Sequence, residues 1–185
     1  MIEANVQLDA KGLACPMPIV KTKKAMQSLQ DGQVLQVIAT DKGSTADLAA
    51  WANSVGHQYI GTTAADDVLY HYIRKCNADA MQTNETPFEH TIMNEEAIAA
   101  DGLIIDVREA AEYAFGHIPG AMSIPLGELA TRMNELAQEE AIYVICRTGT
   151  RSDMAAKQLV AAGFTNVKNV LPGMASYHGE LAKQL

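Results

Sequence analysis

Residues 142–164 read IYVICRTGTRSDMAAKQLVAAGF, and this stretch decides the fold of the second half of the chain. Its first four residues form a short apolar run, which predicts a buried strand of a parallel sheet. A polar loop opened by Cys146 follows, and segment 152–162, which ends before Gly163, predicts a helix. In parallel α/β sheets, reactive groups gather where strands end and helices begin. Cys146 lies at such a junction.

The rest of the second half continues this alternation of strands and helices. We expect strands at 103–107 and 167–170, and helices at 94–100, 110–115 and 126–136. The pattern predicts an α/β domain whose parallel sheet is flanked by helices on both faces.

The first half has a different order of elements. We expect strands at 5–8, 34–39, 57–62 and 68–75, and helices at 16–29 and 44–55, the second capped by Ser44. The order β-α-β-α-β-β predicts two helices against one mixed sheet. The polar stretch 77–87 has no periodicity, so we expect it to link a domain at 1–76 to a domain at 88–185.

The composition of the 185-residue chain, 48% hydrophobic and 19% charged, is typical of a globular protein. No apolar run reaches the roughly 18 residues of a membrane helix, and the N-terminus has no signal-peptide pattern. The three cysteines, Cys15, Cys76 and Cys146, form no CxxC pair and fit neither a disulfide scaffold nor a zinc site. We therefore expect free thiols, no metal, no membrane partner and a cytoplasmic location.

Charge is distributed unevenly along the chain. Residues 1–76 hold seven basic and seven acidic residues, whereas residues 77–185 hold seven basic and fifteen acidic ones. The net charge of −8 therefore belongs to the second half. Such a surface repels nucleic acid, so we expect no nucleic-acid partner.

The loop at Cys146 combines a thiol with groups that attract an anion. Its small residues let successive backbone N–H groups turn inward, and the following helix adds positive potential. Two arginines add full charges, and this setting favours the thiolate form of the cysteine. We expect a cradle for an oxyanion or a persulfide, formed by Arg147, Thr148, Gly149, Thr150, Arg151 and Ser152.

The spacing of this loop bears on its chemistry. Cysteine phosphatases use Cys-x5-Arg, whereas here Arg151 comes one residue early and Ser152 takes the sixth position. A shorter loop makes a tighter cradle, which suits a single sulfur atom better than a phosphoryl group. A cysteine phosphatase or arsenate reductase, and a non-enzymatic module that docks partners, remain as alternatives.

A second candidate thiol lies in the string GLACPMP, where Cys15 directly precedes Pro16. A proline at the start of a helix loses only an N–H group that has no partner there, so Pro16 and Pro18 predict a rigid helix start. We expect donors near Met17 and Ile19 to face the sulfur and to favour a thiolate or persulfide. No acid or base is expected beside it, which indicates a thiol that carries a group without transforming it.

Two segments of the second half resemble the single-domain rhodanese family. They are IIDVREAAEYAFGHIPGAMSIPLGEL at 104–129 and CRTGTRSDMAAKQLVAAGF at 146–164, and the likeness covers roughly 88–185. The resemblance implies that Cys146 is the sulfur-accepting nucleophile and that the loop from Arg147 to Arg151 holds the persulfide and its donor.

Other positions of the rhodanese pattern are interpreted as structural. Asp106 and Arg108 match the family's DVR segment, and we interpret them as an ion pair that braces the sheet edge. His117 lies in the matching Gly-His-Ile-Pro-Gly turn and is expected to be a hydrogen-bonded turn residue. Where the family often has Gly-Gly and a tryptophan, this chain has Pro172-Gly173 and Tyr177, which leaves the donor preference open.

The stretch LDAKGLACPMPIVKTKKAM at 8–26 resembles the TusA/SirA family of small sulfur-carrier proteins. The likeness covers about 1–75 and includes the Cys-Pro-x-Pro signature. It implies a two-layer α/β sandwich in which Cys15 receives a persulfide and passes it to a partner.

Together the two resemblances predict a sulfurtransferase. We expect Cys146 to take sulfane sulfur from thiosulfate or a small persulfide and pass it to an acceptor thiol or sulfur-carrier protein, or to cyanide in vitro. Cys15 is expected to be a second persulfide carrier, by relay within one chain or between two chains. No cofactor is expected beyond the covalent cysteine persulfide. The direction of transfer between the two thiols, and whether the chain forms a homodimer, stay open at this point.

Overall fold

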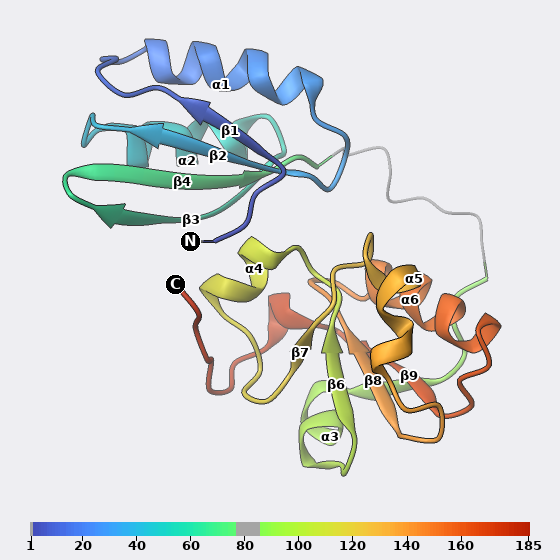
Figure 1. The fold of residues 1–185 in the computed structure, drawn as a ribbon. Helices are drawn as coiled ribbons and strands as arrows, with labels where there is room; N and C mark the ends of the chain where they lie inside the picture. Colours follow the sequence, from blue (N-terminus) through green and yellow to red (C-terminus); the bar gives the residue numbers. More distant parts are fainter. Residues whose placement is uncertain (1, 77–85) are drawn as a thin grey trace. The chain divides into compact units, whose positions relative to one another are not determined.

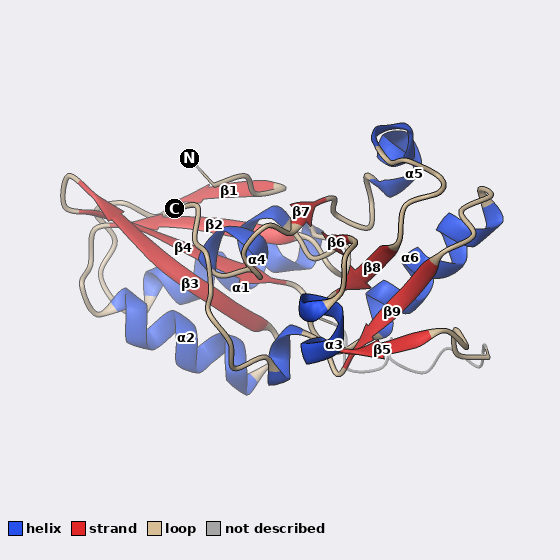
Figure 2. Ribbon diagram, turned by 90° about the horizontal axis from the view of Figure 1, so that it is seen from below, coloured by secondary structure: helices blue, strands red, loops and turns tan. Residues whose placement is uncertain are grey.

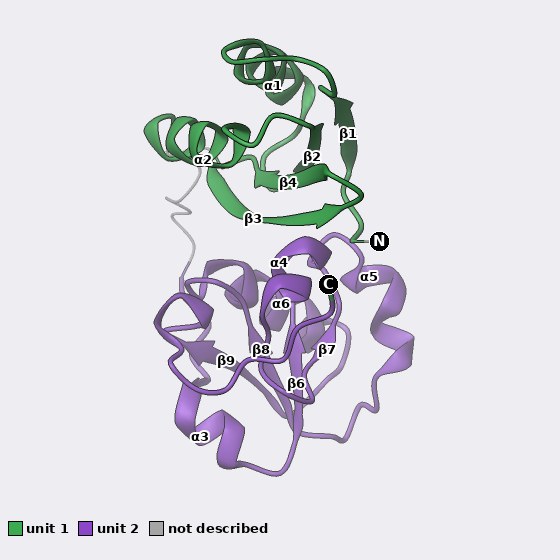
Figure 3. Ribbon diagram, turned by 90° about the vertical axis from the view of Figure 1, so that its left-hand side faces the viewer, with its two compact units in different colours: residues 1–83, 185 green, residues 84–184 purple. Residues whose placement is uncertain are grey.

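The computed structural model of the protein describes residues 2–76 and 86–185. The chain forms two compact units, unit 1 (residues 1–83 and 185) and unit 2 (residues 84–184), shown in different colours in Figure 3. Most of the expected linker 77–87 lies outside the described residues. Within the two described ranges, no helix has both the length and the apolar character needed to cross a membrane.

Unit 1 has the predicted order of elements and packs two helices on one mixed sheet (Figure 1). The strand order is β1-β2-β4-β3, with β1 parallel to β2 and the other pairs antiparallel. The core lies between the helices and the sheet and includes Leu35, Leu48 and Ile73. The elements are β1 (Val6–Asp9), α1 (Met17–Ser28), β2 (Val34–Ala39), α2 (Ser44–Ser54), β3 (Gln58–Ala65) and β4 (Val68–Arg74).

Two details of unit 1 correct the sequence prediction. Strand β3 continues to Ala65, because Asp66 and Asp67, which have positive φ angles of 48° and 62°, make a two-residue hairpin turn. Ser44 is not the N-cap of α2 but its first residue. Its buried hydroxyl donates to the Asp41 carbonyl at 2.5 Å, so it does not cap the helix N–H groups.

Unit 2 is the predicted parallel sheet with helices on both faces (Figure 2). The strand order is β5-β9-β8-β6-β7, and every pair is parallel. Leu129 of α5 and Leu159 of α6 belong to the core on one face, and Ala97 of α3 belongs to the core on the other. The elements are β5 (Thr91–Met93), α3 (Asn94–Ala99), β6 (Leu103–Asp106), α4 (Ala110–Phe115), β7 (Met122–Ser123), α5 (Leu129–Arg132), η1 (Met133–Glu135), β8 (Ile142–Ile145), α6 (Thr150–Ala161), β9 (Val167–Leu171) and η2 (Met174–Ser176).

Three features of unit 2 differ from the prediction. The edge strands β5 and β7 are three and two residues long, too short to show a pattern of alternation in the sequence. The helix expected at 126–136 is the four-residue α5 followed by the 3₁₀ turn η1. Helix α6 begins at Thr150, two residues before the expected start, because Gly149 precedes it in the left-handed region.

Candidate functional site

The Cys146 thiol lies at the carboxyl end of the central strand β8 and is buried, with 1% of the residue exposed. Its Sγ accepts a hydrogen bond from the Gly149 N–H at 3.1 Å. The Ser152 hydroxyl, in the first turn of α6, lies 3.3 Å from the same sulfur. Donors that converge on a sulfur atom suit its anionic form, because a hydrogen bond to a charged group is stronger than one to a neutral group.

Asn169 of β9 completes this network, and sequence reasoning missed it. Its Oδ1 lies 2.6 Å from the Ser152 Oγ, and its Nδ2 donates to the Gly149 carbonyl at 3.2 Å. The residue is 3% exposed. Asn169 lies two residues after Val167 in the strand VKNVL, and so on the same face, which was the available signal, because a buried amide needs partners.

A turn of residues 173–175 fixes the backbone of the Cys146 loop. The Met174 and Ala175 N–H groups donate to the carbonyls of Cys146 and Arg147 at 2.9 and 2.8 Å. Gly173 has φ +93°, and a Cβ added there would lie 2.7 Å from the Cys146 carbonyl oxygen. Both loop carbonyls therefore face this turn. The buried Asn94 side chain holds the turn through bonds of 3.1 and 3.2 Å to the Gly173 backbone.

The two arginines of the loop have different surroundings. Arg151 forms a two-pronged ion pair with Glu112 of α4, with Nη–Oε distances of 2.7 and 3.1 Å. Burial acts to lower the pKa of Arg151, but the Glu112 carboxylate, Cys146 and Glu109 outweigh it and the pKa rises. Arg147 is exposed. Sequence reasoning missed Glu112, whose pairing with Arg151 depends on how α4 packs.

The remaining loop residues lie at the surface or at the start of α6. Thr148 is exposed, Thr150 is the half-buried first residue of α6, and Gly149 is buried. Gly149 has φ +93° and an added Cβ would overlap the Leu171 side chain, so this position requires glycine.

Asp106 and Arg108 form a buried ion pair at the carboxyl end of β6. The guanidinium contacts the carboxylate through Nε at 2.9 Å and through Nη2 at 2.5 Å, and Nη2 also donates to the Gly116 carbonyl at 2.7 Å. His117 stacks on Tyr113, with ring centroids 3.6 Å apart. Its Nδ1 lies 2.9 Å from the Tyr113 carbonyl oxygen, which accepts its hydrogen. These contacts brace the turn.

Cys15 is exposed in the loop before α1, and the start of this helix differs from the prediction. Pro16 is the residue before the first helical residue, and Pro18 lies within the first turn. The Met17 N–H donates to the Ala14 carbonyl at 3.0 Å, so the prediction that it faces the sulfur is wrong. The Met17 N–H is part of the turn that places Cys15 before α1, so it is not available to the sulfur.

Acidic residues of another segment act on Cys15. Asp47 lies in the first turn of α2. The Asp47 carboxylate, then burial and the charge of Asp41, raise the pKa of Cys15. The sequence-based expectations of a favoured thiolate and of no acid or base nearby were therefore both wrong. Sequence reasoning missed Asp47 because it lies 32 positions along the chain.

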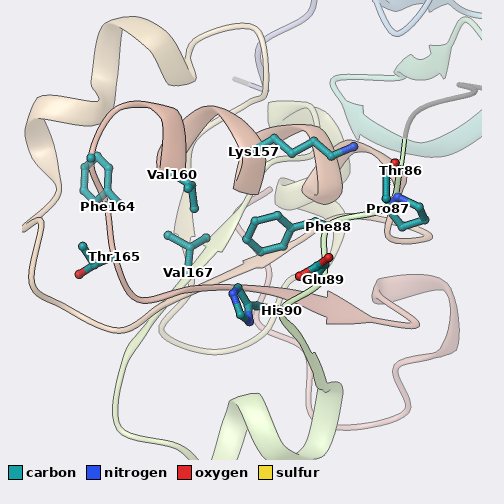
Figure 4. A pocket seen from close by; sticks show the side chains of 11 residues that line it. Thr86, Pro87, Phe88, Glu89, His90, Lys157, Val160, Phe164, Thr165 and Val167 are labelled. Carbon is teal, nitrogen blue, oxygen red and sulfur yellow. The ribbon is translucent and has the colours of Figure 1, made fainter.

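A separate hollow of about 530 Å³ lies in unit 2 between the segment 86–90 and helix α6 (Figure 4). Phe88, Val160 and Val167 are among the side chains that line it. None of the predicted site residues lines this hollow, and we assign no function to it.

Comparison with known proteins gives each half of the chain a family. Residues 6–75 match the family model described as Sulfurtransferase TusA, and residues 90–180 match the model described as Rhodanese-like domain. The chain is 48% identical over 187 residues to "Putative sulfur carrier protein YrkF" of Bacillus subtilis, with 97% of this chain and 99% of the relative covered.

Partial relatives match the two halves separately. The "Sulfur carrier protein TusA" of Allochromatium vinosum is 39% identical, with 40% of this chain and 99% of the relative covered. A solved rhodanese-like domain protein from Staphylococcus aureus is 29% identical with a TM-score of 0.49, and the match covers 52% of this chain and 99% of that one. By its full-length match, the chain belongs to the family of two-domain sulfur carrier proteins in which a TusA domain precedes a rhodanese-like domain.

Proposed function

We propose that the protein is a sulfurtransferase that takes sulfane sulfur from thiosulfate or a small persulfide and holds it on Cys146. A TusA domain together with a rhodanese-like domain indicates sulfur transfer in general. The observation that carries the finer proposal is the buried Cys146 sulfur at the end of β8, with the Gly149 N–H directed at it and the Ser152 Oγ 3.3 Å away.

In the first half-reaction, the Cys146 thiolate attacks the outer sulfur of the donor. A new S–S bond forms on Cys146 and the donor's S–S bond breaks. Sulfite leaves when the donor is thiosulfate, and a thiolate leaves when it is a persulfide. The Gly149 N–H, which contacts the Cys146 Sγ, stabilises the attacking thiolate, and after the transfer the negative charge lies on the outer sulfur of the persulfide.

In the second half-reaction, an acceptor thiolate, or cyanide in vitro, attacks the outer sulfur of the Cys146 persulfide. The Cys146 thiolate is the leaving group and returns to its resting state. Two half-reactions through a covalent intermediate predict ping-pong kinetics. Arg147 and the N–H groups of the loop would hold an anionic donor at the mouth of the site.

Cys15 is proposed as a second persulfide carrier. The match of residues 6–75 to TusA supports this role, and Cys15 is exposed, as a carrier thiol must be. Sulfur would pass between Cys146 and Cys15 by relay within one chain or between two chains.

The test is a map of persulfide by mass spectrometry after the reduced full-length chain has reacted with thiosulfate or glutathione persulfide. We expect the wild type to carry persulfide on Cys146 and on Cys15, and Cys146→Ser to lose the thiosulfate-dependent label on Cys15. Cys76→Ser is the matched control and should label like the wild type. Absence of persulfide on Cys146 contradicts the enzyme proposal, and normal labelling of Cys15 in Cys146→Ser contradicts the relay. Hydrolysis of a phosphate ester instead would favour a phosphatase.

A further inference from the structure

Several acceptors compete for the one hydrogen of the Ser152 hydroxyl. The Ser152 Oγ lies 2.6 Å from the Asn169 Oδ1 and 3.3 Å from the Cys146 Sγ, and a hydroxyl has a single hydrogen to donate. We infer that Asn169 is a positioning residue of the sulfur site, which accepts the Ser152 hydrogen while the Cys146 sulfur is neutral and releases it to the sulfur when the sulfur is an anion. This inference rests on the proposed function, since it describes how the site follows the charge changes of the two half-reactions.

The Gly149 carbonyl fixes the orientation of the Asn169 amide. A carbonyl cannot donate, so the atom of the amide that lies 3.2 Å from it is the donor Nδ2, and Oδ1 is turned to Ser152. The same carbonyl accepts the Asp153 N–H at 2.9 Å, so both of its lone pairs have N–H partners. It lies 3.1 Å from the Ser152 Oγ, farther than the Asn169 Oδ1 does. The Ser152 hydrogen therefore points to Asn169 in the resting protein.

A neutral Cys146 thiol fits this arrangement. With its own hydrogen on Asn169, the Ser152 oxygen presents lone pairs to the sulfur and can accept the hydrogen of the thiol. Cys146 then donates to Ser152, and Ser152 donates to Asn169. The three residues are buried, with 1%, 0% and 3% exposed, so a group left without a partner here would cost free energy.

A thiolate needs the opposite arrangement. It has no hydrogen to give and would face the lone pairs of the Ser152 oxygen, so the hydroxyl turns and donates to the sulfur beside the Gly149 N–H, which lies 3.1 Å from it. A hydrogen bond to a charged acceptor is the stronger one, which favours the turn. The turn leaves the buried Asn169 Oδ1 without its hydrogen bond, which opposes it. Asn169 thereby sets how far the hydroxyl stabilises the thiolate.

The two half-reactions change the charge of the Cys146 sulfur at defined points. Before the attack the sulfur is a thiolate, and the Ser152 hydroxyl points to it. Once the new S–S bond has formed, the charge lies on the outer sulfur, the inner sulfur is neutral, and the hydroxyl returns to Asn169. When the acceptor breaks that S–S bond, the electron pair returns to the Cys146 sulfur and the hydroxyl turns to it again. Asn169 gives the hydroxyl its partner in the loaded state.

A comparison between variants separates the hydroxyl hydrogen from the charges around the sulfur. Charged groups of the loop and of the neighbouring elements are the same in every variant of the test, so they produce no difference between variants. They are Arg147 of the loop, the Arg151–Glu112 pair that joins α6 to α4, and the Asp106–Arg108 pair at the end of β6.

The test is a double-variant cycle of Asn169→Leu and Ser152→Ala, read by the ultraviolet absorbance of the Cys146 thiolate across a pH series. Each reduced full-length protein is compared with its own Cys146→Ser form, so that the difference reports Cys146. We expect Asn169→Leu to raise the ratio of thiolate to thiol by roughly three- to tenfold, because the hydroxyl then turns to the sulfur without leaving a buried acceptor unpaired. In the Ser152→Ala background the same change should have no effect, because the shared hydrogen is absent.

Asn166→Leu is the matched control, because it makes the same substitution at an exposed position just before β9 and should keep the wild-type ratio. Asn169→Ala replaces Asn169→Leu if the larger side chain unfolds the protein, and the same rise is expected. An unchanged ratio in the folded Asn169 variant overturns the inference. An equal rise with and without the Ser152 hydroxyl also overturns it, because the effect would then come from the shape of the loop.

Delivery of sulfur gives a separate readout. Loaded wild type and loaded Asn169→Leu are mixed with cyanide in a single turnover, and the variant should deliver faster, because the Cys146 thiolate is the leaving group. An unchanged delivery rate overturns the role of Asn169 in the reaction. A wild type that takes up no sulfane sulfur on Cys146 refutes the proposed function, whereas the absorbance cycle still decides where the Ser152 hydrogen goes.

Discussion

The guanidinium of Arg151 and the carboxylate of Glu112 form a nearly buried ion pair, with side chains 14% and 1% exposed. The residues lie 39 positions apart, so the pair joins α4 to the first turn of α6 beside the Cys146 loop. Glu112 also accepts a hydrogen bond from the Glu109 N–H at 3.2 Å, which ties it to the start of α4. The pair thus positions the helix that presents Ser152.

Removing one partner of this pair should destabilise unit 2. Glu112→Gln leaves the Arg151 charge buried without its counter-ion, and we expect a loss of about 3–5 kcal/mol in the free energy of unfolding. Hydrogen exchange of the backbone amides in β8 and α6 measures this loss of stability. Glu135→Gln, which breaks the exposed pair with Arg132, is the matched control and should leave that exchange unchanged. Equal effects of the two variants would contradict this account.

The Ser152 hydroxyl should matter both for the rate of sulfur transfer and for stability, because its removal also leaves the buried Asn169 Oδ1 without its hydrogen bond, at a cost of about 1–3 kcal/mol. Ser152→Ala removes one of the two donors near the Cys146 sulfur, and a lost hydrogen bond to a charged group of about 1.5 kcal/mol slows loading by roughly tenfold. Single-turnover persulfide formation with thiosulfate measures this rate. Ser176→Ala, at an exposed serine of η2, is the control. A Ser152→Ala protein that loads at the wild-type rate would show that the hydroxyl does not face the reacting sulfur.

Gly173 and Gly120 offer a test of the turn that holds the Cys146 loop. Both have positive φ, +93° and +82°, so alanine at either costs about 1–3 kcal/mol of backbone strain. At Gly173 the new Cβ also meets the carbonyls of Cys146 and Arg147 at 2.7 and 2.9 Å, whereas at Gly120 it meets nothing within 4 Å. We expect Gly173→Ala to slow sulfur transfer and Gly120→Ala to leave it unchanged, in the same single-turnover assay. Equal rates of persulfide formation in Gly173→Ala and Gly120→Ala would refute this prediction.

Local patterns in the sequence predicted much of the architecture. The apolar run before Cys146 is strand β8 as expected, because a short apolar stretch between polar segments is typical of a buried strand. Asp106 and Arg108 are two positions apart, so their pairing could be anticipated from the segment itself. The order of elements in unit 1 was predicted for the same reason.

Contacts between distant segments could not be predicted this way. Asp47 raises the pKa of Cys15 from a position 32 residues along the chain, and Asn169 meets Ser152 only because β9 is next to β8. Both relationships depend on which segments the fold brings together, which the local periodicity does not contain. The error at Cys15 followed directly, because a helix start favours a thiolate only where no carboxylate acts against it.

His71, on β4, is the buried hub of a polar network under α2. Its Nε2 lies 2.9 Å from the Ser44 hydroxyl, which donates its own hydrogen to Asp41, so Nε2 carries the ring proton. Its Nδ1 accepts from the Tyr59 hydroxyl at 2.8 Å. Burial lowers the pKa of His71 from 6.5 to about 4, because the doubly protonated ring is charged and a buried charge loses its contact with water.

The stability of unit 1 should therefore fall in acid. Between pH 6.5 and about 4 the unfolded chain binds a proton at His71 and the native protein does not, so the free energy of unfolding declines by up to about 3 kcal/mol as the pH drops through that range. Trp51 in α2 is the one tryptophan of the chain, so urea unfolding followed by its fluorescence reports on unit 1. In His71→Gln, the free energy of unfolding should no longer decline between pH 6.5 and 5. This range lies above the one in which most carboxylates titrate. A wild-type slope in that variant would assign the acid sensitivity to other groups.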